Sequence, residues 1–130
     1  MDPVTRCPCS SGLPADACCD PVLADPAAAR TAEQLMRSRY TAYVRGDTAH
    51  LLATWHPRTR PASLDLDDDV RWEGLEVLAR ERGGPFDDEG TVEFRAHSRD
   101  RFADGRTVQH EVSRFVREGG RWLYVDGTPG

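Results

Sequence analysis

The sequence predicts an α+β fold in which two helices cover one face of an antiparallel sheet, with a short cysteine-rich segment in front of them. Apolar residues recur at helical spacing between residues 31 and 57, and they alternate with polar ones, as in strands, between residues 91 and 126. Helices that precede the strands, instead of alternating with them, are typical of this fold class. All four cysteines lie before residue 20, apart from both regions.

The cysteine-rich segment has the spacing of a metal site: Cys7-Pro8-Cys9, then Cys18-Cys19. Four thiolates are common ligands of a closed, tetrahedral zinc site. The fixed φ of Pro8 limits how the first pair folds around a metal. The adjacent second pair disfavours disulfides, because neighbouring half-cystines bridge each other only through a strained ring. Two disulfides between the pairs, or a redox pair at Cys7 and Cys9, are the alternatives.

The composition narrows the classes of function. The 130-residue chain holds 17 basic and 22 acidic residues, a net charge of -5, which argues against a general nucleic-acid binder. Residues 1–5 carry no signal-peptide pattern, and no apolar run approaches the ~20 residues of a membrane span. We therefore expect no membrane association and a cytoplasmic location, where a cysteine cluster is more often a metal site than a disulfide framework.

The first helix is predicted from Leu35 to Arg45, after a capping box that begins at Thr31 and ends at Gln34. Its apolar residues form one broad stripe at helical spacing: Leu35, Met36, Tyr40, Tyr43 and Val44. Three arginines are expected on or near the other side: Arg37, Arg39 and Arg45.

A second, shorter helix is predicted directly after the first. Gly46 suits the left-handed position that ends a helix, and Asp47 is the expected cap of the next one. That helix extends through Trp55, and Pro57 ends it. Residues 57–69, which include a run of aspartates, are predicted to form a loop.

Three long antiparallel strands are predicted to follow as a meander. Residues 70–82 alternate only loosely, whereas residues 91–97 alternate cleanly between apolar and polar side chains. Residues 103–106 carry a hairpin signal, Ala-Asp-Gly-Arg. The returning strand covers residues 107–118, and a last strand covers residues 121–126.

Several motifs resemble those of a known family. The run Cys7-Pro8-Cys9, with Ser11-Gly12 and Cys18-Cys19, resembles the SEC-C motif, a small zinc-binding module found at the C-terminus of the preprotein-translocation ATPase, where it contacts a secretion chaperone. Over the whole chain the sequence is similar to the YchJ-like family, bacterial proteins whose function is not established. The motifs that carry this likeness are Leu35–Tyr43, Thr54–Pro57, Ser113–Phe115 and Trp122–Gly127.

The resemblance implies a fold, a metal and a division of the chain. It implies a SEC-C-like zinc knuckle and linker over residues 1–30, with zinc held by Cys7, Cys9, Cys18 and Cys19. It implies an NTF2-like cone, in which helices pack on a curved antiparallel sheet, over residues 31–130. Ser10 departs from the pattern, which usually has glycine there, and it would be mildly strained if the position needs a positive φ.

NTF2-like cones often contain a pocket, and six residues are its candidate polar lining: Tyr40, Tyr43, His56, Glu111, Ser113 and Arg114. Strand alternation places Glu111, Ser113 and Phe115 on one face, which we expect to point inward. A carboxylate held in an apolar cone is an ingredient of acid–base catalysis. The alternative for Glu111 is an ion pair with a helix arginine, Arg37 or Arg39. Both His50 and His97 are expected at the surface.

Two classes of function remain open on the sequence. The first is a non-enzymatic adaptor, whose knuckle docks a protein partner linked to export or the ribosome and whose cone offers a site for a partner or a small molecule. Closed zinc sites of four cysteines favour this class, because they leave no open coordination position. The second is a small isomerase or hydrolase that uses Glu111 with a tyrosine in the cone.

Overall fold

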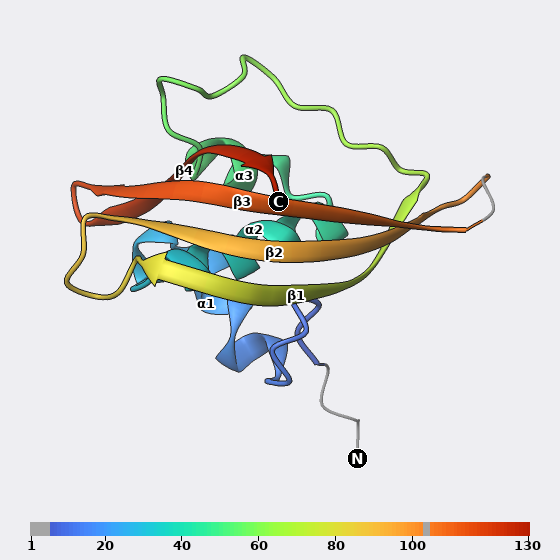
Figure 1. The fold of residues 1–130 in the computed structure, drawn as a ribbon, viewed down its shortest axis with the longest axis horizontal. Coiled ribbons are helices and arrows are strands. Elements are labelled where there is room, and N and C mark those ends of the chain that lie inside the picture. The colour runs from blue at the N-terminus through green and yellow to red at the C-terminus, as the bar shows by residue number, and fades with distance from the viewer. Residues whose placement is uncertain (1–5, 103–104) are drawn as a thin grey trace.

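The computed structural model describes residues 6–102 and 105–130 and has helices before strands. Short elements come first: η1 (Ala15–Ala17), α1 (Cys19–Ala24) and η2 (Pro26–Ala28). They are followed by helices α2 (Ala32–Arg45) and α3 (Thr48–Ala53) and by strands β1 (Val70–Arg82), β2 (Glu89–Asp100), β3 (Arg106–Glu118) and β4 (Arg121–Pro129). Figure 1 shows α2 and α3 behind the sheet and the cysteine-rich segment beside β1. The α+β prediction is confirmed.

The sheet is a single antiparallel meander with the strand order β1-β2-β3-β4. It has one strand more than the three predicted, because residues 70–82 form a full strand at one edge. The register between β1 and β2 shifts twice, after Trp72 and after Val77. Each shift breaks the alternation on which sequence patterns depend, and this explains why the stretch looked irregular.

The predicted hairpin at residues 103–106 falls partly on residues 103–104, which lie outside the described residues. Arg99 pairs with Arg106, so the strands on either side of it are antiparallel neighbours. The other strands extend beyond their predicted limits, and β4 continues to Pro129. The loop predicted at residues 57–69 contains no helix or strand.

Both predicted helix caps are present. The Thr31 hydroxyl accepts a hydrogen bond from the backbone N–H of Gln34 at 3.1 Å, and Gly46 has φ +73°. The Asp47 carboxylate accepts from the N–H of His50 at 3.0 Å. The second helix is shorter than predicted, because Thr54 leaves it to accept a backbone hydrogen bond from Tyr124 on β4 at 2.8 Å.

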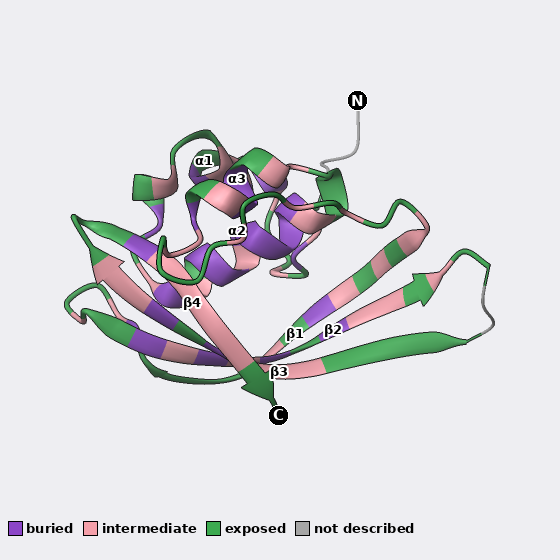
Figure 2. Cartoon of the chain, turned by 90° about the horizontal axis from the view of Figure 1, so that it is seen from above, coloured by how far each residue is buried: buried purple, intermediate pink, exposed green. Residues whose placement is uncertain are grey.

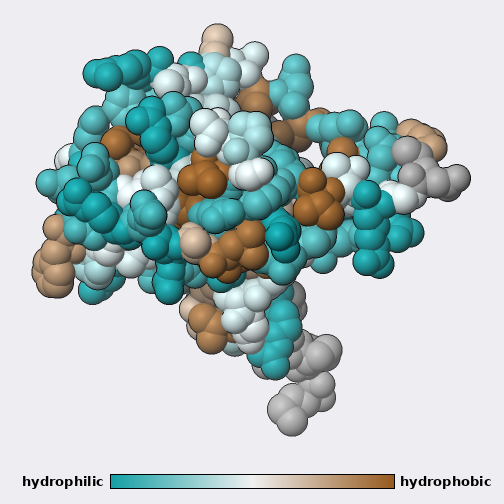
Figure 3. Space-filling model, viewed as in Figure 1, coloured by the Kyte–Doolittle hydropathy of each residue, from teal (hydrophilic) through white to brown (hydrophobic). Residues whose placement is uncertain are grey.

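The core lies between the helices and the inner face of the sheet (Figure 2). Trp122 is fully buried there, and its indole N–H donates to the Arg30 carbonyl at 3.1 Å. Strand β2 contributes the three residues predicted to share a face: Val92, Phe94 and Ala96. The outer face of the sheet is mainly hydrophilic, with scattered hydrophobic residues (Figure 3). Among the described helices none is long and apolar enough to cross a membrane.

Two predictions about polar residues were wrong. Arg39 does not lie on the polar side of α2 but is buried, with 6% exposure. It lies four residues from both Leu35 and Tyr43, so it shares their stripe. His50 is also buried, because α3 turns its first residues back onto α2, where the ring accepts or donates a 3.0 Å hydrogen bond with the Ser38 hydroxyl.

Candidate metal centre and cavity

The cysteine-rich segment folds back on itself before it enters α1. The Cys7 N–H donates to the Leu13 carbonyl at 2.9 Å, which closes a tight loop. Two residues in that loop have a positive φ, Ser10 at +66° and Gly12 at +85°. The position that usually holds glycine in the SEC-C motif therefore does need the left-handed conformation. The loop brings the first cysteine pair against the second, which stands at the start of α1.

The four sulfur atoms have the spacing of a tetrahedral metal site. All lie within 4.8 Å of one another, and Cys18 Sγ is 3.5 Å from Cys9 Sγ and 3.9 Å from Cys19 Sγ. In a tetrahedron with metal–sulfur bonds of ~2.3 Å, sulfur atoms are separated by about 3.8 Å. Four sulfur donors fill such a shell. The cluster therefore fits a closed, thiolate-coordinated metal without rearrangement of the chain.

Protons and a metal compete for these sulfurs. A hydrogen bond from Cys19 lowers the pKa of Cys9 to about 4, so this sulfur is a thiolate at neutral pH. Burial raises the pKa of Cys18 to about 11, and the hydrogen bond to Cys9 raises the pKa of Cys19. A metal must displace the protons of such thiols, so its affinity is expected to weaken as the pH decreases.

Polar groups of α2 and of the cysteine-rich loop itself surround the cluster. Arg37 of α2 donates to the Cys9 carbonyl at 2.9 Å, and its Nη1 lies 3.9 Å from the Cys9 sulfur. The hydroxyl of Thr41, one turn further along α2, lies 3.7 Å from the Cys7 sulfur. The Ser11 hydroxyl lies 3.1 Å from the Cys18 sulfur. Charge and hydrogen-bond donors around thiolates orient metal ligands and reduce their net negative charge.

The cysteine segment is also attached to the sheet. Its Ser10 hydroxyl accepts a 3.1 Å hydrogen bond from the Leu75 N–H of β1, next to the register shift in that strand. Three of the cysteines are buried in the same apolar cluster as Leu35 and Val92. The metal site and the cone therefore share one core.

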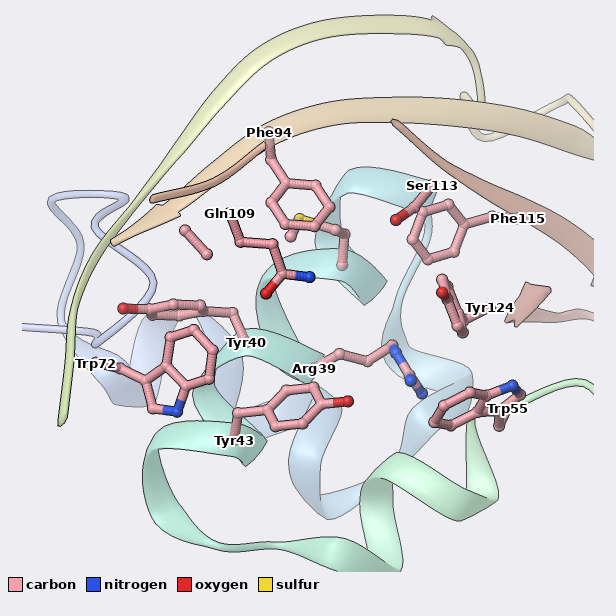
Figure 4. A pocket seen from close by; sticks show the side chains of 12 residues that line it. Arg39, Tyr40, Tyr43, Trp55, Trp72, Phe94, Gln109, Ser113, Phe115 and Tyr124 are labelled. Carbon is pink, nitrogen blue, oxygen red and sulfur yellow. The ribbon is translucent and has the colours of Figure 1, made fainter. Parts of the chain in front are cut away.

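A cavity of about 300 Å³ lies on the other side of α2, between this helix and the sheet. Figure 4 shows its walls, which come from α2, the segment after α3, and all four strands. Aromatic rings form most of the lining: Tyr40, Tyr43, Trp55, Trp72, Phe94, Phe115 and Tyr124. The polar lining residues are Arg39, Gln109 and Ser113.

Arg39 forms one end of the cavity. Its guanidinium lies 4.6 Å from the centre of the Tyr124 ring and 5.0 Å from that of Trp55. Its Nη1 donates to the Leu51 carbonyl at 2.8 Å and to the Thr54 hydroxyl at 2.7 Å. Burial lowers the pKa of Arg39 to about 10, so the group stays charged at neutral pH.

Three of the six predicted pocket residues line this cavity: Tyr40, Tyr43 and Ser113. Glu111 is on the predicted face of β3, beside Ser113 and Phe115, but it is not among the lining residues. Its carboxylate lies over Gly127 of β4, and burial raises its pKa. The alternative ion pair of Glu111 with a helix arginine is wrong, because Arg37 pairs with Glu33 and Arg39 with uncharged groups.

The other two predicted residues lie elsewhere. His56 and Arg114 line a second hollow of about 480 Å³ together with Glu118. His56 Nε2 is 3.1 Å from a Glu118 carboxylate oxygen, and its backbone N–H donates to β4, so it anchors the loop after α3. Arg114 is held by Asp126, with both of its bonds at 2.7 Å.

Several residues that line the cavity were not predicted from the sequence, for three different reasons. Arg39 could have been found, since its spacing from Leu35 placed it on the buried stripe. Trp55 and Trp72 were predicted to belong to the core. Nothing in the sequence indicates that a cavity lies between them. Gln109 lies two residues before Glu111 and therefore on the same predicted face of its strand. Extending the alternation by one step would have included it.

Fold and site together define the class: this is an NTF2-like α+β protein with an N-terminal cysteine cluster suited to binding a metal. The sequence model "YchJ, middle NTF2-like domain" matches residues 31–127. A UPF0225 protein of Streptomyces coelicolor is 51% identical over 125 residues, which cover 96% of each chain. A UPF0225 protein of Chromobacterium violaceum is 52% identical over 93% of this chain and 90% of its own. The chain belongs to the YchJ-like family.

Solved structures agree with this assignment. The solution structure of a SEC-C motif containing protein from Rhodopseudomonas palustris matches with a TM-score of 0.84 at 34% identity, over 97% of this chain and 99% of the other. The crystal structure of a SEC-C motif containing protein from Psychrobacter arcticus matches with a TM-score of 0.73 at 28% identity, over 95% of this chain and 82% of the other.

Proposed function

We propose that this protein is a cytoplasmic, non-enzymatic adaptor in which a structural zinc ion fixes the cysteine knuckle, residues 6–24, onto an NTF2-like body with a ligand site. The observation that carries the proposal is the closed set of four sulfurs, all within 4.8 Å of one another. Zinc is the metal that such a set of thiolates most commonly holds in proteins. A filled shell leaves no position for substrate or water, which favours a structural role over Lewis-acid catalysis.

The knuckle offers a surface for a protein partner. Its loop exposes Leu13, which is 50% accessible beside a hollow lined by Cys18, Gln34 and Arg37. The likeness of this loop to the SEC-C motif favours a partner linked to protein export or the ribosome. The cavity on the far side of α2 is the second site, and it suits a small molecule because it is concave, mostly apolar and provided with few polar groups.

The enzyme hypothesis has weaker support. Among the described residues that line the cavity there is no carboxylate and no histidine. Glu111 has the raised pKa that a general acid needs, but its carboxylate is beside Gly127 and Gln109 and is not part of the cavity wall.

Native mass spectrometry of the protein, purified from cytosol without added metal, tests the zinc and the cavity together. We expect the mass of one zinc ion with four reduced thiols, and a fraction of molecules that retains a small organic molecule. Two disulfides and no metal would contradict the proposal.

A pull-down tests the docking surface. Deletion of the knuckle is a poor test, because its cysteines belong to the common core. The substitution Leu13→Asp alters the exposed loop alone, and Leu78→Asp on β1, 40% exposed, is the matched control. We expect Leu13→Asp to lose a partner that the wild type and Leu78→Asp both retain. Identical sets of partners for all three proteins would exclude docking through this loop.

A further inference from the structure

The cavity contains a buried positive charge that the chain itself does not neutralise. Arg39 has 6% exposure, yet it forms no ion pair with a carboxylate within the described residues. Neighbouring arginines on the same helix are paired: Arg37 with Glu33 and Arg45 with Asp20. A buried charge is costly unless an opposite charge or a full set of hydrogen bonds compensates it.

The hydrogen bonds of Arg39 are incomplete. A guanidinium has five N–H donors in a planar fork. Only Nη1 has partners in the described part of the chain, the Leu51 carbonyl and the Thr54 hydroxyl. The nitrogens Nε and Nη2 remain, and they form the edge of the fork that binds a carboxylate with two parallel hydrogen bonds.

Aromatic rings cover part of the guanidinium of Arg39. The rings of Trp55 and Tyr124 lie 5.0 and 4.6 Å from its guanidinium carbon, and the residue is 6% exposed. In Figure 4 the amide of Gln109 and the phenol of Tyr43 point into the same space. The Tyr43 phenol can donate a hydrogen bond to an anion that reaches Arg39. The Gln109 amide nitrogen donates one N–H to the Glu111 carboxylate at 3.3 Å and has a second N–H to offer.

The opposite end of the cavity is apolar. Tyr40 and Tyr43 contact Trp72 with ring centres 5.8 and 5.9 Å apart, and Phe94 closes the wall above them (Figure 4). Aromatic walls of this kind bind flat or branched apolar groups, which contact the ring faces and edges. The volume of about 300 Å³ limits the occupant to a small molecule.

From this polarity we propose that the cavity binds a small organic acid, whose carboxylate pairs with Arg39 and whose aromatic or branched apolar body lies against Trp72 and Phe94. The inference rests on the proposed role of the cavity as a ligand site and adds the chemical class of the ligand. A bare phosphate or a nucleotide fits less well, because the described residues of the cavity wall include one cation, Arg39, and are mainly apolar.

Matched pairs of an acid and its neutral amide test the inference on the unaltered protein. Cinnamate with cinnamamide and phenylpropanoate with phenylpropanamide differ only in the charged group that Arg39 would bind. Binding is measured by the fluorescence of Trp55 and Trp72 and by NMR shifts of the cavity residues. We expect each acid to bind about 10- to 100-fold more tightly than its amide, the usual effect of a charge-assisted hydrogen bond.

Variants then assign the difference to Arg39. Arg39→Met removes the charge and keeps the unbranched stem, and Arg39→Lys keeps the charge without the fork. Arg114→Met removes the same charge from the exposed side of β3 and is the control. We expect the preference for the acid to vanish in Arg39→Met, to shrink in Arg39→Lys and to remain in Arg114→Met. Metal content and thermal unfolding verify that each variant is folded.

The outcomes separate this inference from the proposed function. Equal binding of acid and amide in the cavity would overturn the inference and leave the cavity a ligand site. A preference for the acid that survives in Arg39→Met would also overturn it, since another cation would then be responsible. If no member of any pair shifts a cavity residue, both the ligand site and its specificity for acids are wrong.

Discussion

The metal site and the cavity lie on opposite sides of α2 and are built in opposite ways. The four cysteine sulfurs come from thirteen consecutive residues, 7–19, and they meet through one tight loop and the start of α1. The cavity gathers side chains from α2, the segment after α3 and four strands, over residues 36–124. A local site can be inferred from the spacing of a motif, whereas a non-local one requires the register of every element around it.

Helix α2 connects the two sites. Arg37 and Thr41 face the cysteines, while Arg39, Tyr40 and Tyr43 face the cavity. Residues a few positions apart point to different faces of a helix. A shift of α2 would therefore move side chains in both sites. The knuckle contacts α2 through Arg37 and β1 through Ser10, so it helps to hold the helix against the sheet.

The substitution Cys9→Ser is expected to have the largest effect. It removes one of the four metal ligands and the sulfur beside Arg37. Structural zinc binding contributes ~10–16 kcal/mol in small zinc-dependent folds, so we expect loss of the metal and of order in residues 6–24. Metal analysis and the backbone amide NMR spectrum measure both.

The control for this substitution is Cys9→Ala, measured in the presence of excess zinc. Alanine has no atom that binds the metal, so the added zinc cannot replace the missing ligand. If Cys9→Ser keeps one equivalent of zinc and the wild-type spectrum of residues 6–24, the four-sulfur site is not the metal centre.

The second effect concerns the sheet side of the core that the cone shares with the cysteines. Trp122 of β4 is fully buried and lies far from the cysteines in sequence. Trp122→Ala leaves a large cavity and an unpaired Arg30 carbonyl, so we expect the free energy of unfolding to fall by ~3–5 kcal/mol. Urea denaturation gives the value. Metal stoichiometry of the folded variant should stay unchanged, and its loss would show that the metal site depends on the far end of the cone.

His50 provides a pH-dependent test of the contact between α3 and α2. Burial lowers its pKa in the folded protein, so the unfolded chain binds a proton near pH ~6.5 that the folded chain does not. Stability is therefore complete above this pH and falls as the pH decreases through it, by up to ~1.4 kcal/mol per pH unit.

The variant His50→Gln keeps a donor near the Ser38 hydroxyl and has no titrating ring. Its stability should change less steeply than that of the wild type between pH 7 and pH 5, measured by thermal unfolding across this range. Parallel curves for the two proteins would assign the acid sensitivity to groups other than His50.

The smallest effect concerns the joint between the knuckle and β1. Ser10→Ala loses the hydrogen bond from Leu75 and keeps the unfavourable positive φ, so we expect a loss of ~1 kcal/mol. Ser10→Gly loses the same bond and relieves a strain of ~1–2 kcal/mol, and its stability should stay near that of the wild type. If Ser10→Gly is the less stable of the two, the conformation of this loop does not limit the knuckle.

Features that depend on residues close together in the chain were predicted best from the sequence. The meeting of the four cysteines, both helix caps and the inward position of Ser113 and Phe115 were predicted correctly, because each depends on neighbours within a few positions. The strand over residues 70–82 was missed because two register shifts disrupt its pattern. Arg39 was predicted to lie on the polar side of the helix because it is charged, although its spacing from Leu35 favoured burial. The separation of His56 and Arg114 from the cavity depends on strand register and on the path of the loop after α3, which no local pattern contains.

The proposed adaptor role depends on a closed zinc site made of four cysteines. X-ray absorption at the zinc edge of the purified protein tests it most directly, because it counts the sulfur neighbours of the metal. We expect four sulfurs at ~2.3 Å and no oxygen or nitrogen neighbour. A shell with fewer sulfurs and a light atom would mean an open site, and it would contradict the structural role on which the adaptor proposal depends.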